Sequence, residues 1–141
     1  MLMVCLLCTY QVILSHFFVE RARNRFLTQE FLHENFGQHH EACFNKSKIQ
    51  KGGHPDNGDG RYFKKAGYRA WHEFAQIHRV YQNLSENISQ FIVSLLIAGM
   101  YFPLAAAAWG GMYFLLRIGY HWGYVRSPEA RLPFVPFMTN V

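Results

Sequence analysis

The sequence has few cysteines and lacks charge over two long stretches. Three cysteines among 141 residues do not supply the disulfide framework that holds small secreted domains together. Residues 1–19 contain no Asp, Glu, Lys or Arg, and residues 84–116 contain a single one, Glu86. A helix needs about 20 apolar residues to cross the hydrocarbon core of a bilayer, so these stretches predict membrane helices.

Several catalytic and metal-binding motifs are also absent. The chain has no Gly-rich phosphate loop and no nucleophile elbow. His39-His40-x-x-Cys43 contains zinc-ligand residue types, but no second pair follows at zinc spacing. A solvated loop is therefore favoured, and no metal is expected. Cys5-x-x-Cys8 lies inside an apolar run without βαβ context, which favours two small buried residues over a redox motif.

The apolar runs predict an all-α, integral membrane helical bundle. Three spans are visible, at residues 1–20, 79–102 and 103–125, and Pro103 separates the last two. The first run lacks the basic n-region and small-residue cleavage site of a signal peptide, so we expect it to stay in the membrane. Residues 21–78 contain a cluster of turn formers at 51–60 and predict a basic loop with Gly and His. A short amphipathic helix over Arg25–Phe36 is an alternative for part of it.

The basic residues predict the topology. Of the 14 Lys and Arg residues, 12 lie at 21–78 or 126–141, Arg79 begins the second span and Arg117 lies toward the end of the third, and residues 101–105 contain none. Cytoplasmic segments carry the excess of Lys and Arg in membrane proteins, so the loop at 21–78 and the tail at 126–141 are predicted to be cytoplasmic. The net charge of +5 then reflects topology, with some attraction to anionic lipid, and no nucleic-acid partner is expected.

Two rows of polar residues stand out within the apolar runs. At helical spacing each row shares one face. The first row consists of Arg79, Asn83, Glu86 and Gln90, and the second of Arg117, Tyr120 and Tyr124. Ionisable groups inside membrane helices are costly and mark functional sites. Both rows lie at the cytoplasmic ends of their spans, so they can converge on a small zwitterionic peptide with more than one carboxylate.

These rows carry a family resemblance. Arg79-x-x-x-Asn83-x-x-Glu86, followed by Arg117-x-x-Tyr120-x-x-Gly-Tyr124-x-Arg126-Ser-x-x-x-Arg131, resembles the membrane-associated eicosanoid and glutathione metabolism proteins. That family includes leukotriene C4 synthase and the microsomal glutathione transferases. The resemblance covers residues 74–132, with a weaker match at 19–26.

The resemblance implies a four-helix membrane protein of the endoplasmic reticulum or nuclear envelope that assembles as a homotrimer. It implies glutathione as cosubstrate, with a lipophilic electrophile or lipid hydroperoxide as the second substrate. The implied glutathione-binding residues are Arg23, Arg79, Asn83, Glu86, Tyr120 and Tyr124. Arg131 matches the arginine that stabilises the glutathione thiolate, a role that agrees with the lowering of a thiol pKa by a neighbouring cation.

The chain also departs from the family pattern. Asn24, Tyr81 and Asn87 replace residues of the leukotriene synthase branch, which favours a general transferase or peroxidase. A fourth apolar span is missing after residue 125, and we interpret the sequence as an incomplete gene model. Two alternatives remain: a noncatalytic lipid-binding member like five-lipoxygenase-activating protein, and an inactive truncated fragment. Arg131 and Glu86 favour the enzyme.

Overall fold

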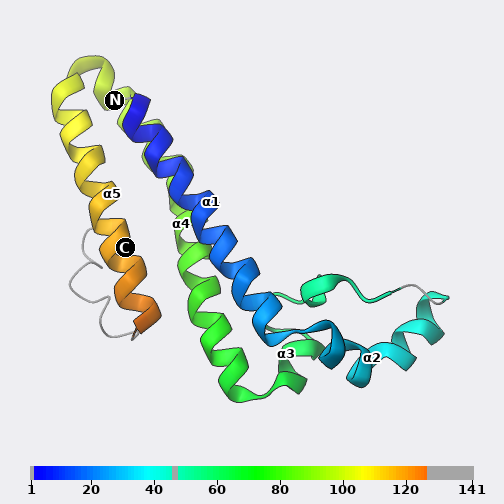
Figure 1. Ribbon diagram of the computed structural model, residues 1–141. Coiled ribbons are helices and arrows are strands. Elements are labelled where there is room, and N and C mark those ends of the chain that lie inside the picture. Colours follow the sequence, from blue (N-terminus) through cyan, green and yellow to red (C-terminus); the bar gives the residue numbers. More distant parts are fainter. Residues whose placement is uncertain (1, 46–47, 127–141) are drawn as a thin grey trace. The chain divides into compact units, whose positions relative to one another are not determined.

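A computed structural model describes residues 2–45 and 48–126. Within these ranges the chain is helical and contains no strand (Figure 1). The elements in order are α1 (Leu2–Phe26), α2 (Gln29–Phe44), the 3-10 turn η1 (Lys51–Gly53), α3 (Arg61–Ala66), α4 (Tyr68–Tyr101) and α5 (Pro103–Arg126). The all-α prediction is thereby confirmed.

The chain forms two compact units. The second unit covers Phe17–His78, and the first covers the rest of the described chain. Helices α1 and α4 each contribute residues to both units. Each unit is packed around its own buried residues.

Three helices build the first unit, in which α1, α4 and α5 run side by side (Figure 1). Gln11 of α1 donates from Nε2 to the carbonyl oxygen of Phe114 in α5, at 3.0 Å. Gly110 lets α1 approach α5 closely, because a Cβ atom there would lie 2.6 Å from Cγ1 of Val4. Small buried residues thus hold the helices at short range, as is usual for helices in membranes.

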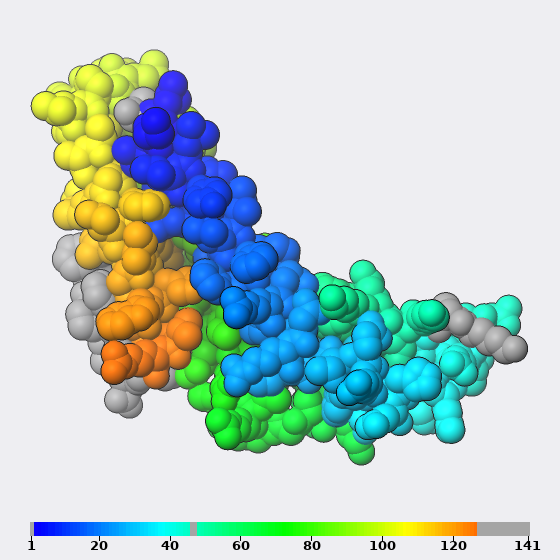
Figure 2. All heavy atoms as spheres, in the orientation of Figure 1, coloured from blue at the N-terminus to red at the C-terminus, as the bar shows by residue number. Residues whose placement is uncertain are grey.

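The outer side of α1 is apolar. Leu2, Leu6 and Ile13 have exposed fractions of 70%, 65% and 61%, and the atoms of α1 lie at the surface in Figure 2. By length and composition, α1 is the one helix in the described ranges that meets the requirements of a membrane span. The spans proposed at 79–102 and 103–125 correspond to parts of α4 and α5, and crossing by these helices stays a prediction.

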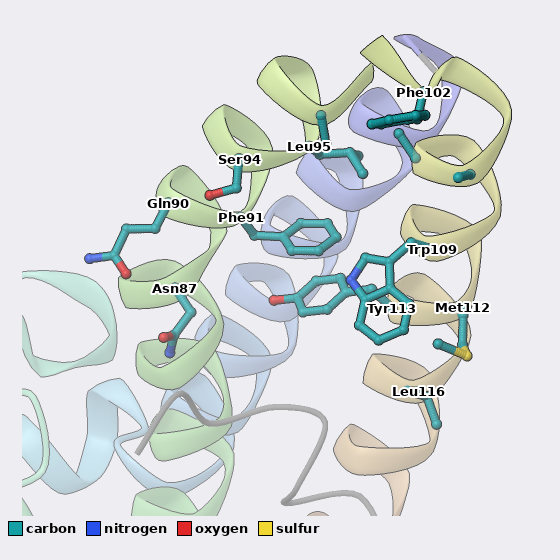
Figure 3. A pocket seen from close by; sticks show the side chains of 13 residues that line it. Asn87, Gln90, Phe91, Ser94, Leu95, Phe102, Trp109, Met112, Tyr113 and Leu116 are labelled. Atoms are coloured by element: carbon teal, nitrogen blue, oxygen red, sulfur yellow. The ribbon is translucent and has the colours of Figure 1, made fainter. Parts of the chain in front are cut away.

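A groove separates α4 from α5 on one side of the first unit (Figure 3). It has a volume of about 620 Å³. Its walls include Phe91 and Leu95 from α4 and Trp109 and Tyr113 from α5. The rings of Phe91 and Tyr113 stack with their centroids 3.6 Å apart.

The second unit contains helices where we expected a loop over residues 21–78. Helix α2 begins at a proper cap, since the side chain of Thr28 accepts a hydrogen bond from the backbone N–H of Phe31. Leu32 and Gly37 are its buried residues. The alternative of a short helix over Arg25–Phe36 was nearer to the structure, but α1 continues to Phe26 and α2 runs on to Phe44. The sequence did not predict the full length of α2, because its many polar residues and Gly37 weaken the apolar pattern of a helix.

One carboxylate organises the turn-rich segment of the second unit. Asp56 is 7% exposed, and its side-chain oxygens accept four hydrogen bonds from backbone N–H groups. The donors are Gly58, Gly60, Tyr62 and Phe63, at 2.9, 2.9, 2.8 and 3.2 Å. The Gly- and Asp-rich sequence therefore forms a defined structure and leads directly into α3.

Candidate functional site

The row on α4 is divided between partly buried and exposed positions. Asn83 is half-buried, whereas Arg79, Glu86 and Gln90 are exposed. Arg79 and Glu86 make no ion pair within residues 2–45 and 48–126. The row therefore presents a cation and a carboxylate outward, on either side of an amide that faces the helix bundle.

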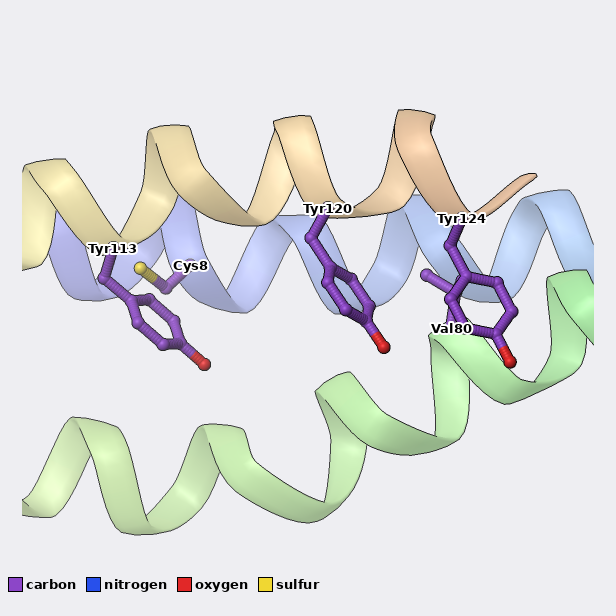
Figure 4. Packing of buried hydrophobic residues seen from close by; sticks show 5 residues of the cluster. All are labelled: Cys8, Val80, Tyr113, Tyr120 and Tyr124. Atoms are coloured by element: carbon purple, nitrogen blue, oxygen red, sulfur yellow. The ribbon is translucent and has the colours of Figure 1, made fainter. Parts of the chain in front are cut away.

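The row on α5 is buried. Tyr120 and Tyr124 are 4% and 9% exposed and belong to an apolar cluster with Cys8, Val80 and Tyr113. Figure 4 shows the three tyrosine rings projecting from α5 toward α4, with their hydroxyl groups leading. Tyr120 and Tyr124 thus face the helix that carries the other row, and their binding of a ligand stays a prediction.

Arg117 makes the direct connection between the rows. Its Nη1 atom donates to Oδ1 of Asn83 at 2.6 Å, and its Nε atom donates to the hydroxyl of Tyr113 at 2.9 Å. The guanidinium carbon lies 5.2 Å from the centroid of the Tyr113 ring and 5.8 Å from that of Tyr120. These aromatic faces stabilise a cation that is 3% exposed.

Arg117 was part of the α5 row in the sequence, but we did not count it among the ligand-binding residues. An arginine inside an apolar helix was the available signal. The structure adds that no carboxylate of the described residues pairs with it and that its Nη2 atom is buried without a hydrogen-bond partner. The cation is instead held by the hydrogen bonds to Asn83 and Tyr113 and by the rings of Tyr113 and Tyr120.

Arg23 belongs to the second unit and is 2% exposed. Its guanidinium donates to the carbonyl oxygen of Asp56 and, at 3.1 Å, to Oδ1 of Asn57. It also lies 5.2 Å from the centroid of the Phe74 ring. In a single chain Arg23 therefore holds the turn-rich segment in place. Its predicted contact with glutathione stays a prediction.

His78 lies close to this arginine, just before the row on α4. Burial, followed by the positive charge of Arg23, lowers the pKa of His78. Because its usual pKa is about 6.5, the imidazole is neutral at pH 7. The neutral imidazole thus adds no positive charge beside Arg23, whose Nε atom lies 3.5 Å from Oε1 of Glu20.

Two further predictions concern Arg131 and the His/Cys segment. Arg131 lies outside the described residues. His39, His40 and Cys43 line a cavity of about 420 Å³ together with side chains such as Tyr62. In the ranges that the structure describes, no group of three or more His, Cys, Asp or Glu residues is placed to hold a metal ion.

Comparison with known proteins identifies relatives. A sequence model of the MAPEG family matches residues 1–140. Leukotriene C4 synthase of Cavia porcellus is 43% identical over 61 residues, which are 43% of this chain and 41% of that protein. Microsomal glutathione S-transferase 2 of Mus musculus is also 43% identical over 61 residues, which are 43% of this chain and 42% of that protein. The chain thus matches about two fifths of the length of these relatives, and no solved structure matches it.

Proposed function

Because the chain belongs to the MAPEG family, a family of membrane helical bundles, we propose that it is a membrane-bound glutathione S-transferase. The observation that carries this proposal is the hydrogen bond between Arg117 and Asn83, which joins the polar rows of α4 and α5. Its relatives include leukotriene C4 synthase and microsomal glutathione S-transferase 2. Enzymes of those names use glutathione. A charged, polar peptide of this kind needs polar side chains for its binding, and the rows on α4 and α5 supply them.

The proposed binding mode divides glutathione among the charged and polar residues. The Arg79 guanidinium binds a carboxylate, and the Glu86 carboxylate binds the α-ammonium group. Asn83, Tyr120 and Tyr124 supply hydrogen bonds to the peptide. Arg23 of an adjacent subunit completes the site in a homotrimer of the endoplasmic reticulum or nuclear envelope membrane.

Arg131 provides the chemistry in this proposal. A free thiol has a pKa of about 8.5, and a nearby guanidinium lowers it, which raises the fraction of thiolate at neutral pH. The thiolate sulfur then forms a bond to the electrophilic carbon of a lipophilic substrate, and the leaving group departs with the bonding electrons. In the peroxidase reaction, two glutathione molecules reduce a lipid hydroperoxide to an alcohol and water and become a disulfide.

The test is conjugation of glutathione to an activated aryl halide by the detergent-purified full chain. We expect turnover together with thiolate absorbance when glutathione is added. Arg131→Ala should lower kcat/KM roughly tenfold or more, because each unit by which the thiol pKa rises above the assay pH removes about nine tenths of the remaining thiolate. Arg69→Ala is the matched control, since that side chain is 91% exposed.

The outcomes separate the alternatives. Absence of both turnover and thiolate absorbance in the wild-type protein would refute the transferase. If such an inactive protein bound fatty acid in its place, the noncatalytic lipid-binding function would be supported, and the apolar groove of Figure 3 would be the candidate site. Equal activity of Arg131→Ala and the wild type would contradict the role of Arg131 alone.

A further inference from the structure

The amide of Asn83 has a fixed orientation. Arginine carries only hydrogen-bond donors, so the Asn83 atom that faces Nη1 of Arg117 at 2.6 Å must be the oxygen. The NH2 group occupies the other branch of the amide and therefore points away from Arg117. Within the described residues this NH2 group makes no hydrogen bond.

We propose that Arg117 is a positioning residue that fixes Asn83 as a hydrogen-bond donor, so that Asn83 selects a carboxylate or carbonyl group of the ligand and rejects an ammonium group. This inference rests on the proposed function. A freely rotating asparagine offers either an acceptor or a donor. An asparagine held by a buried guanidinium offers only the donor.

The geometry explains why Arg117 can hold this orientation. Its own position is fixed by the hydrogen bond to Tyr113 and by the aromatic faces of Tyr113 and Tyr120. Rotating the amide of Asn83 would place NH2 against the guanidinium and leave a second buried donor unpaired, which costs free energy in a low-dielectric interior. The fixed amide therefore follows from burial of the cation.

The neighbouring charges on α4 fit a ligand with ends of opposite sign. Arg79 lies four residues before Asn83 and Glu86 lies three residues after it, and both are exposed. Asn83 and Arg79 are then the donors for a carboxylate, and Glu86 is the acceptor for an ammonium group. Arg117 thus contributes to the discrimination between the two ends without contacting the ligand.

Thermal unfolding without ligand tests the contact itself. The detergent-purified variants are Asn83→Asp, Arg117→Met and the double variant, with Asn35→Asp and Arg69→Met as controls away from the first unit. Aspartate keeps the oxygen that accepts from Arg117, so Asn83→Asp should unfold at or above the wild-type temperature. In the Arg117→Met background the same change should lower the unfolding temperature, because the carboxylate has lost its partner. Equal effects in both backgrounds would overturn the inference.

Ligand binding tests the selectivity. Calorimetric titration with S-hexylglutathione, which cannot react as a thiol, should show roughly ten- to hundredfold weaker binding to Asn83→Asp, because a hydrogen bond to a charged group is lost. Arg117→Met should weaken binding and raise KM for glutathione more than it changes kcat, and Arg117→Lys should restore part of the loss. The wild type should prefer S-hexylglutathione to its diethyl ester, and Asn83→Asp should lose that preference.

The failures of the two proposals are distinguishable. If Asn83→Asp binds S-hexylglutathione as tightly as the wild type does, the donor role of Asn83 is refuted and the transferase proposal is unaffected. Wild-type protein that does not bind this ligand would refute the glutathione site. In that case the proposed selectivity for a glutathione carboxylate is refuted as well. The unfolding temperatures of Asn83→Asp, Arg117→Met and the double variant still decide whether Arg117 fixes the amide.

Discussion

Asp56 and Arg23 illustrate how single side chains give structure to a segment whose composition predicts a loop. The Asp56 carboxylate accepts from four backbone N–H groups, and the backbone carbonyl oxygen of Asp56 accepts from Arg23. Hydrogen bonds to a charged acceptor contribute more than those between neutral groups. The segment between η1 and α3 is consequently tied to α1 by the same residue that organises it internally.

Replacement of this carboxylate should therefore loosen the segment. We expect Asp56→Ala to destabilise the second unit by about 3 kcal/mol or more, because several buried donors lose their acceptor at once. Hydrogen exchange at the amides of Gly58, Gly60, Tyr62 and Phe63 would measure the change. Asp59→Ala is the matched control, since Asp59 is exposed and makes none of these contacts. Unchanged protection in Asp56→Ala would contradict the assignment.

At the level of single residues, the sequence predicted which polar residues share a helix face, but it did not predict which of them contact one another. The rows on α4 and α5 were found from spacing, because helical periodicity determines which residues share a face. The hydrogen bond between Arg117 and Asn83 joins residues 34 positions apart, and no local pattern encodes it. The same is true of Arg23, whose carbonyl acceptor lies 33 positions away.

At the level of elements, strong local signals were enough for the long helices. Pro103 was expected to separate two helices, and α4 ends at Tyr101 while α5 begins at Pro103. The start of α4 was missed by eleven residues, since the polar stretch from Tyr68 to His78 has no apolar run. Helix α2 was missed for most of its length because Gly37 and polar side chains weaken its periodicity.

The packing of α1 against α4 and α5 depends on one glycine. A Cβ atom at Gly110 would lie 2.6 Å from Cγ1 of Val4 and 2.9 Å from Cδ2 of Leu95. We expect Gly110→Ala to destabilise the first unit by about 1–3 kcal/mol, as overpacked cores do. Thermal unfolding in detergent would measure this.

Gly111 provides a control for the same substitution. A Cβ atom there would meet no other atom within 4 Å. Gly111→Ala should therefore leave stability unchanged or raise it slightly, because alanine favours the helix over glycine. Equal losses for the two variants would mean that something other than the contact between α1 and α5 determines the cost.

For the whole molecule, the distribution of charge is the main argument for topology. Twelve of the 14 basic residues belong to the segments 21–78 and 126–141, which are predicted to face the cytoplasm, and the other two, Arg79 and Arg117, lie in the predicted spans. Membrane association is supported by the family and by the apolar helix α1. The orientation of the segment between α1 and α4 is our prediction, and the chain itself contains two reporters for it.

Cys43 and Asn45 are those reporters. Cys43 is exposed, whereas Cys5 and Cys8 are buried, so a membrane-impermeant maleimide should label Cys43 in sealed microsomes before detergent is added. Cys43→Ser should abolish the labelling. Asn45 begins an Asn-Lys-Ser acceptor sequence, which is glycosylated only in the lumen, so removal of N-glycans should leave the electrophoretic mobility unchanged. Cys43 and Asn45 both lie between α1 and α4. Labelling that requires permeabilisation, or a glycan on Asn45, would therefore place this segment in the lumen and reverse the predicted topology.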